Sequence, residues 1–178
     1  MSRAYSASLG LLLLGTSALG DTPANVFQIG GAVRAPRTWS AAQIEQQRAG
    51  DVRALVYTVK GHRHTARAIP LWTLLQAAGP RVNPQIKHHL LQFLVAVRGQ
   101  DGYTADFTLG ELSPDFGGRA VWVALDEDGR RLTGDGGPAQ LLVPEDKKPA
   151  RWVHAVRAII VSDGALLPAS PAPAPAGT

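Results

Sequence analysis

The sequence predicts an α+β domain built mostly from β-strands with a few short helices. Segments rich in β-branched and aromatic residues recur along the chain, each bounded by glycine, proline or acidic turn residues. Helical signals are confined to short, scattered segments. The chain of 178 residues is 45% hydrophobic, which suits one folded domain and excludes wholesale disorder.

The predicted strands are short, and turn residues separate them. After Gly61, the segment 62–67 is expected to continue the strand Val52–Val59 as extended chain or to form the second strand of a hairpin with it. In chain order the strands are Val26–Ile29, Val52–Val59, Leu90–Val97, Tyr103–Leu109, Ala120–Leu125, Gln140–Val143 and Val153–Val161.

Two short helices are predicted from their boundary signals. Ser40 is a favourable N-cap for a helix over 41–48, and Gln43 completes a capping box. A second helix over 70–78 has a proline at its start and Gly79 at its end, an arrangement that favours helix boundaries. Its apolar residues share one face, which is expected to be buried: Leu71, Leu74, Leu75 and Ala78.

The two ends of the chain differ in composition from the domain at 21–165. Residues 1–20 have the features of a secretory signal peptide, with Arg3, an apolar run and a small-x-small cleavage site. We therefore expect a periplasmic or secreted protein without a stable membrane anchor, because the apolar run is too short to span a bilayer. Residues 166–178 are rich in proline and alanine and are expected to be disordered.

Cysteine content and charge limit the chemistry. The chain has no cysteine, which excludes disulfides, a cysteine nucleophile and any metal held by a protein thiolate. The net charge is +4, and the arginines are scattered along the chain and not clustered. This distribution does not favour nucleic acid as a partner and suits a small anionic ligand.

Two groups of basic residues are candidates for binding. Lys147, Lys148 and Arg151 lie close together on a proline-bounded loop, where they would clamp a phosphate or carboxylate or form a solvated loop. His62 and His64 are two positions apart on extended chain, so their side chains point the same way.

That histidine spacing leaves two interpretations open. The pair would hold a metal with a third ligand such as His88 or His89, or it would be an exposed pair without a ligand role.

Three segments of the chain carry recognisable sequence motifs. The first is Val-Lys-Gly-His-Arg at 59–63, followed by Ile-Pro-Leu-Trp-Thr-Leu-Leu at 69–75. The second is Asp-Gly-Tyr at 101–103, which leads into Phe-Thr-Leu. The third is Val-Ala-Leu at 123–125, followed by 137–144, by Arg151-Trp152-Val153 and by a closing strand. Together they resemble the oxidoreductase molybdopterin-binding domain, the sulfite oxidase-type fold, over residues 26–162. The resemblance implies that fold and a pterin-binding site.

The chain departs from the family pattern at the positions that carry the chemistry. Val59 stands at the position of the metal-ligating cysteine, and His62 replaces an asparagine, whereas Arg63 keeps the basic position. Gln140 replaces the arginine that follows Gly-Pro-x, and Arg151 replaces the lysine before tryptophan. Valine has no lone pair, so thiolate-bound molybdenum is not expected.

The resemblance then implies a binding module for molybdopterin, a related pterin or another small anionic ligand. One alternative is a molybdenum-cofactor-dependent oxidoreductase with a non-cysteine ligand such as His62. Another is a scaffold for an exported redox or signalling protein. No catalytic residue and no metal ligand is assigned. The residues expected to bind the ligand are His62, Arg63, Asp101, Tyr103, Lys147, Lys148 and Arg151.

Overall fold

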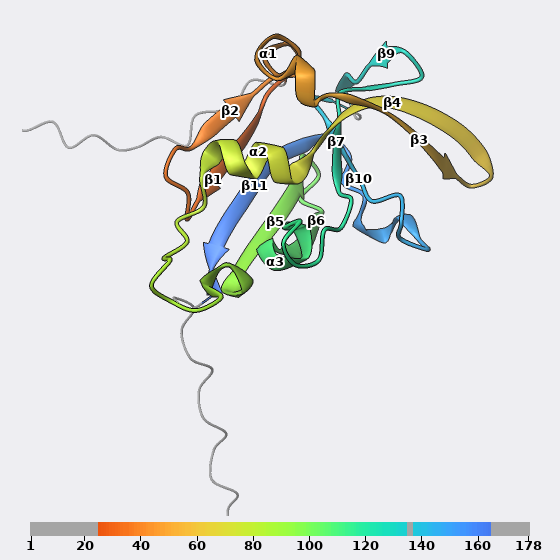
Figure 1. Cartoon of the computed structure of the whole chain (residues 1–178). Helices are drawn as coiled ribbons and strands as arrows, with labels where there is room; N and C mark the ends of the chain where they lie inside the picture. The colour runs from red at the N-terminus through yellow and green to blue at the C-terminus, as the bar shows by residue number, and fades with distance from the viewer. Residues whose placement is uncertain (1–24, 135–136, 165–178) are drawn as a thin grey trace, which may run out of the picture.

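The computed structural model describes residues 25–134 and 137–164 (Figure 1). The expected signal peptide and the expected disordered tail lie outside these ranges. The described chain forms two β-sheets and a small β-ribbon, with few helices, all of them short. The predicted α+β class with mostly β-strands is therefore confirmed. None of the helices in the described part is long and apolar enough to cross a membrane.

The first sheet has five strands and carries one face of the core. β1 runs parallel to β11, and the other neighbouring pairs are antiparallel. Side chains alternate between a buried and an open face, as in β5, where Phe93, Val95 and Val97 are buried. The order across the sheet is β2 (Arg37–Trp39), β1 (Phe27–Gly31), β11 (Val156–Asp163), β5 (Phe93–Gly99) and β6 (Thr104–Thr108).

The second sheet has four strands and is antiparallel throughout. Its long β3–β4 hairpin projects from the body of the molecule (Figure 1). β8 (Asp126–Glu127) and β9 (Arg130–Arg131) form the separate ribbon. The order across the sheet is β10 (Gln140–Leu142), β7 (Trp122–Ala124), β4 (His62–Pro70) and β3 (Arg53–Val59).

The two predicted helices are present. α1 (Ala41–Gln47) begins with the expected capping box: the Ser40 Oγ accepts from the Gln43 amide at 3.1 Å, and the Gln43 side chain accepts from the Ser40 amide at 2.8 Å. α2 (Leu71–Ala78) packs against β1 and β4 with its four predicted core residues fully buried. Gly79 ends it with a φ of +67°, the left-handed conformation that glycine adopts without strain.

Several predicted boundaries were wrong. Residues 90–92 belong to a 3-10 helix (His89–Gln92), because the buried His89 side chain joins the Asn83 amide to Asp163. Leu109 starts α3 (Leu109–Leu112), because the Thr108 side chain caps it by accepting from the Glu111 amide. The last strand begins at 156, since Val153 pairs with Leu141 of β10 instead. Two further 3-10 helices cover Ala49–Asp51 and Pro149–Arg151.

A candidate ligand cavity beside the β3–β4 hairpin

The register of the β3–β4 hairpin decides which of its side chains share a face. A two-residue turn at Lys60 and Gly61, both with positive φ, places Val59 opposite His62. Tyr57 then stands opposite His64, so these two pairs share one face of the hairpin, and Arg63 lies on the other.

That face borders a cavity of about 310 Å³, which is at the lower end of the range for small-molecule sites. The hairpin, the β8–β9 ribbon, β10 and the segment before β11 all contribute to its wall. The lining residues are Tyr57, Val59, Lys60, Glu127, Gln140, Pro149, Trp152 and His154.

Aromatic rings form one side of the cavity. Tyr57 and Trp152 meet edge to face with ring centroids 5.3 Å apart, and His64 stacks on Tyr57 at 5.5 Å. The Trp152 indole N–H donates to the Val143 carbonyl at 3.0 Å, which fixes the orientation of the ring. The cavity therefore presents pre-oriented aromatic surface to a ligand.

A tyrosine–carboxylate hydrogen bond lies at the wall of the cavity. The Tyr57 hydroxyl donates to Glu127 Oε1. Burial of the phenol raises the pKa of Tyr57 well above its ordinary value, and the hydrogen bond to Glu127 and the negative charge of that carboxylate raise it further. Tyr57 is consequently a neutral donor throughout the physiological range.

The turn between β8 and β9 is fastened to β4 by Asp128. Its Oδ1 accepts from the Thr65 amide at 2.8 Å and from the Thr65 hydroxyl at 3.2 Å, and its Oδ2 lies 2.9 Å from His64 Nδ1. The Thr65 amide, followed by the His64 side chain, lowers the pKa of Asp128 below its ordinary value. This attachment holds the neighbouring Glu127 at the cavity.

Arg151 is engaged with carboxylates. Its Nε and one terminal nitrogen contact the two Asp146 oxygens at 2.8 and 2.7 Å, and the other terminal nitrogen contacts Glu111 at 3.0 Å. The guanidinium also lies 4.9 Å from the Phe107 ring centroid. Arg119 contacts the same two carboxylates, so the two positive charges of the arginines balance the two negative charges of Asp146 and Glu111. This geometry makes Arg151 a structural cation that anchors the loop after β10.

The other predicted binding residues lie around that loop and the hairpin tip. Lys147 and Lys148 are exposed just before Pro149 of the cavity wall. The Asp101 side chain accepts from the Tyr103 amide at 2.9 Å within the β5–β6 turn, and the Tyr103 hydroxyl donates to the Ala150 carbonyl. Asp101 and Tyr103 thus support the loop from the other sheet.

His62 and Arg63 are both exposed at the hairpin tip, where only His62 shares the cavity face. His64 Nδ1 contacts the Asp128 carboxylate, and the His89 ring contacts the Asn83 amide and the Asp163 carboxylate. Across residues 25–134 and 137–164 no three His, Asp or Glu side chains are grouped to hold a metal ion.

Sequence reasoning missed several lining residues. Tyr57 and Glu127 are far apart in the chain and meet only because the ribbon docks on the hairpin. One local signal was present for Tyr57: it is two positions from Val59 on a strand, and residues two apart share a face. Glu127 and His154 lie next to turns and carry no comparable signal.

The fold is similar to a solved structure of a larger protein. The crystal structure of the sulfane dehydrogenase SoxCD from Paracoccus pantotrophus matches 78% of this chain with a TM-score of 0.56 and 20% sequence identity. The chain spans 38% of the length of that chain. No family model and no curated protein matches the sequence. At this identity the comparison shows the fold alone.

The cavity brings together three positions that the sequence resemblance matches to the family pattern. Val59 occupies the position of the expected cysteine, Gln140 that of the expected arginine, and Trp152 that of the expected tryptophan. They come from three separate segments, and the fold gathers them around one cavity.

Proposed function

We propose that the protein binds a small anionic ligand of the pterin type in the cavity lined by Tyr57 and Trp152, without thiolate-held molybdenum. The observation that carries this proposal is Gln140. Its side chain is only 5% exposed, lines the cavity and forms no hydrogen bond within the described residues. The fully buried side-chain atoms without a hydrogen bond among the described residues are Trp39 Nε1 and Arg48 Nε, so the Gln140 amide reaches the open space of the cavity, where a polar ligand edge would give it a hydrogen-bond partner.

The remaining wall suits a planar heterocycle. Tyr57 and Trp152 offer ring surface, and the second Glu127 oxygen, Oε2, has no partner in the described part of the chain. A pterin edge has both N–H donors and a carbonyl acceptor. Glu127 would accept from the donors, and the Gln140 amide would pair with either kind of group.

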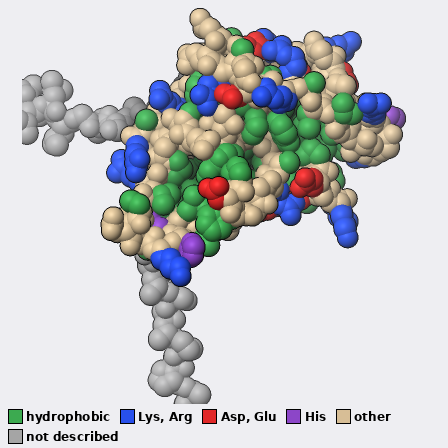
Figure 2. All heavy atoms as spheres, in the orientation of Figure 1, with side chains coloured by type: hydrophobic (Ala, Val, Ile, Leu, Met, Phe, Trp, Pro, Cys, Tyr) green, Lys and Arg blue, Asp and Glu red, His purple; other side chains and the backbone are tan. Residues whose placement is uncertain are grey.

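The rim of the cavity suits a negative charge on the ligand. Lys60 and His154 line the cavity, Lys147 and Lys148 lie next to Pro149, and none of the four forms an ion pair with another described residue. Figure 2 shows Lys and Arg side chains spread over the visible face of the molecule, including its hairpin end. A phosphate or carboxylate would meet the unpaired ammonium groups of the three lysines here.

The residues do not fit a molybdenum ion held by a protein thiolate. Val59 presents hydrocarbon at the expected ligand position, and the chain has no cysteine elsewhere. A second candidate function, a molybdenum-cofactor oxidoreductase with an imidazole ligand, is favoured by one observation. His62 stands directly opposite Val59 on the cavity face.

The test is to produce the chain in a host that makes molybdenum cofactor and to measure bound molybdenum by mass spectrometry and bound pterin by fluorescence after acid oxidation. We expect equimolar pterin without molybdenum. Molybdenum together with pterin would favour the second candidate. If neither is bound, the proposal is wrong, and a role as a scaffold for a protein partner would be the next hypothesis.

Two variants sharpen the test. Gln140→Leu removes the amide from the cavity wall, so pterin content should fall at least about tenfold while the ligand-free protein stays folded. Gln76→Leu makes the same change on the exposed face of α2 and should leave the pterin content unchanged. A loss of pterin in both variants, or in neither, would argue against a ligand contact at Gln140.

A further inference from the structure

The outer edge of β3 presents backbone groups with no partner. The two-residue turn makes Val59 and His62 a hydrogen-bonded pair, so alternate residues from Val59 back to Arg53 direct their N–H and C=O groups toward β4. The intervening residues, Ala54, Val56 and Thr58, direct theirs away from β4.

Hydrogen bonds on the far side of β4 fix this assignment. Thr65 pairs with Val56, and its amide and carbonyl bond to Asp128. Arg67 pairs with Ala54, and its amide and carbonyl bond to Asp126 and Leu125. Because these β4 groups point away from β3, the groups of Ala54 and Val56 point away from β4. No described residue bonds to them or to those of Thr58.

This edge lacks the features that usually prevent strand addition. β3 is seven residues long, has no proline or lysine, and carries a single charge, at Arg53. Val56 at its centre is 48% exposed. At the opposite edge of the same sheet, β10 is covered, because Leu141 exchanges backbone hydrogen bonds with Val153 at 2.8 and 3.2 Å. Natural proteins protect long edges, so an open one indicates a partner strand.

We propose that the partner is β3 of a second copy of this chain, paired antiparallel about a two-fold axis at Val56. In this register Val56 faces Val56 of the second copy, and Ala54 faces Thr58. Each such pair exchanges two backbone hydrogen bonds, so all the open groups of the edge are satisfied.

The side chains fit this self-pairing. The residues brought face to face on the outer surface are uncharged, and the central pair is β-branched, which favours strand pairing. On the cavity side Leu55 meets Tyr57 of the second copy, an aliphatic–aromatic pair. Arg53, the only charge of the strand, meets Val59, so no like charges oppose one another.

The pairing has two structural consequences. The four-stranded sheets of the two copies join into one continuous eight-stranded sheet, because β3 is the last strand of each. It also places Arg53 of the second copy beside Val59, which lines the cavity. Among the described residues of the monomer this guanidinium donates only to the Gly50 and Val52 carbonyls, and no carboxylate there pairs with it, so its charge can meet an anion. The pairing itself does not depend on what the cavity binds.

Cysteine scanning tests the register directly, because the natural chain has no cysteine. Val56→Cys places the two sulfurs face to face at the two-fold axis, within reach of a disulfide. Ala54→Cys places them about 14 Å apart, since four residues separate the two positions along the strands. We expect oxidation to cross-link the first variant and to leave the second as single chains. Equal cross-linking of both, or of neither, would overturn the proposal.

Sedimentation equilibrium of the unmodified protein gives the independent measurement. We expect twice the monomer mass at high concentration, and the monomer mass for Val56→Lys, which places two lysines opposite one another. Thr58→Lys is the matched control, because its lysine faces Ala54 and the dimer should persist. Circular dichroism and the Tm of each variant verify folding. A natural chain that stays monomeric at every concentration, or a Val56→Lys dimer, would overturn the proposal.

Discussion

Arg151 illustrates how the partners of a cation decide its role. From the sequence it belongs with Lys147 and Lys148 as part of an anion clamp. In the structure the lysines are exposed, whereas the guanidinium is flanked by Asp146 and Glu111 and lies over the Phe107 ring. Its contacts are those of a residue that holds two segments together, and the lysines remain available for a ligand.

Replacing Arg151 should therefore cost stability. Arg151→Met leaves Asp146 and Glu111 with Arg119 alone, and we expect urea unfolding to show a loss of about 2 kcal/mol. Lys148→Met, an exposed change in the same loop, should stay within about 0.5 kcal/mol. Arg151 lowers the pKa of Asp146 in the folded protein. The stability that this ion pair contributes is therefore present above the ordinary aspartate pKa and is lost as the pH falls through the lowered pKa of Asp146.

The loss of stability at acidic pH thus provides a second test of the role of Arg151. The natural protein should lose stability on acidification in this range more steeply than Arg151→Met. If the two proteins share the same pH profile, the ion pairs do not stabilise the loop as the geometry indicates.

Tyr57 gives a prediction at alkaline pH. Burial and the hydrogen bond to Glu127 raise its pKa, so in the folded state it keeps a proton that the unfolded chain releases above pH about 10. Its contribution to stability is therefore present below that pH and is lost above it. An ultraviolet titration of the folded protein should show one phenol that ionises late, and Tyr57→Phe should remove that component alone. A late phenol in the variant would assign it to another tyrosine.

At the scale of elements, two glycines with nearly the same φ occupy different surroundings. Gly31, at the end of β1, has a φ of +86°, and a Cβ there would lie 2.1 Å from the Val161 carbonyl oxygen. Gly61, in the β3–β4 turn, has a φ of +82°, and a Cβ would meet nothing within 4 Å. Backbone strain is common to both positions, and steric crowding occurs only at the first.

The alanine variants separate the two effects. Gly61→Ala should cost about 1–2 kcal/mol, the penalty for a left-handed non-glycine residue. Gly31→Ala should cost clearly more, about 3 kcal/mol or above, because the β1–β11 pairing must shift to admit the methyl group. Thermal or urea unfolding of the two variants side by side measures the difference. Equal losses would mean that the sheet adjusts to the clash without cost.

The elements that the sequence predicted correctly are those with local signals. The Ser40–Gln43 capping box fixes the start of α1, and the apolar face of α2 matches its buried residues. The misplaced boundaries depend on distant partners instead. Residues 90–92 look like a strand until His89 bonds to Asp163, and β2 exists as a strand only because β1 pairs with it.

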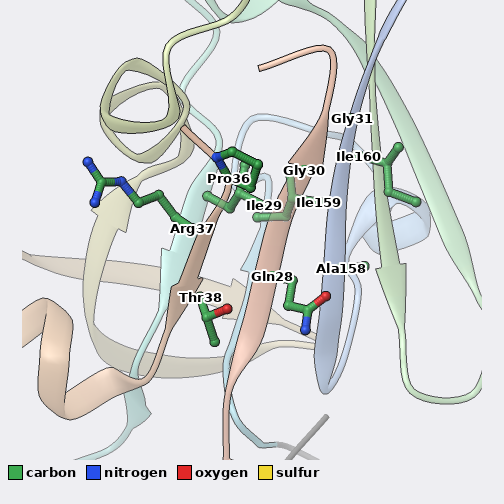
Figure 3. A pocket seen from close by; sticks show the side chains of 10 residues that line it. All are labelled: Gln28, Ile29, Gly30, Gly31, Pro36, Arg37, Thr38, Ala158, Ile159 and Ile160. Atoms are coloured by element: carbon green, nitrogen blue, oxygen red, sulfur yellow. The ribbon is translucent and has the colours of Figure 1, made fainter. Parts of the chain in front are cut away.

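The shallow hollow over the edge of the first sheet shows why cavity shape alone does not identify the site. It lies over β2, β1 and β11 where Gly30 has no side chain, and Figure 3 shows it bordered largely by small and aliphatic side chains. Its volume of about 400 Å³ exceeds that of the cavity beside the hairpin. Its lining has no aromatic ring and no carboxylate, unlike that of the cavity beside the hairpin, and Arg37 is its one cationic lining residue.

At the scale of the whole molecule, the β3–β4 hairpin takes part in both proposals. One face of β3 lines the cavity through Tyr57 and Val59, and its open edge is the proposed dimer interface. If Arg53 of the second copy, which lies beside Val59 in the proposed dimer, contacts the ligand, ligand binding and dimerisation are linked. Linkage is reciprocal: the factor by which the dimer tightens the ligand equals the factor by which the ligand tightens the dimer.

This linkage predicts a pattern among three variants. With a monophosphorylated pterin as the probe, monomeric Val56→Lys should bind about tenfold more weakly than the natural dimer, a typical coupling of about 1.4 kcal/mol. Arg53→Gln should remain dimeric and lose the same factor, because it removes the charge that the second copy supplies. The double variant should bind no more weakly than Val56→Lys, since in a monomer Arg53 no longer reaches the cavity of a second copy. Additive losses would show that Arg53 acts within its own chain.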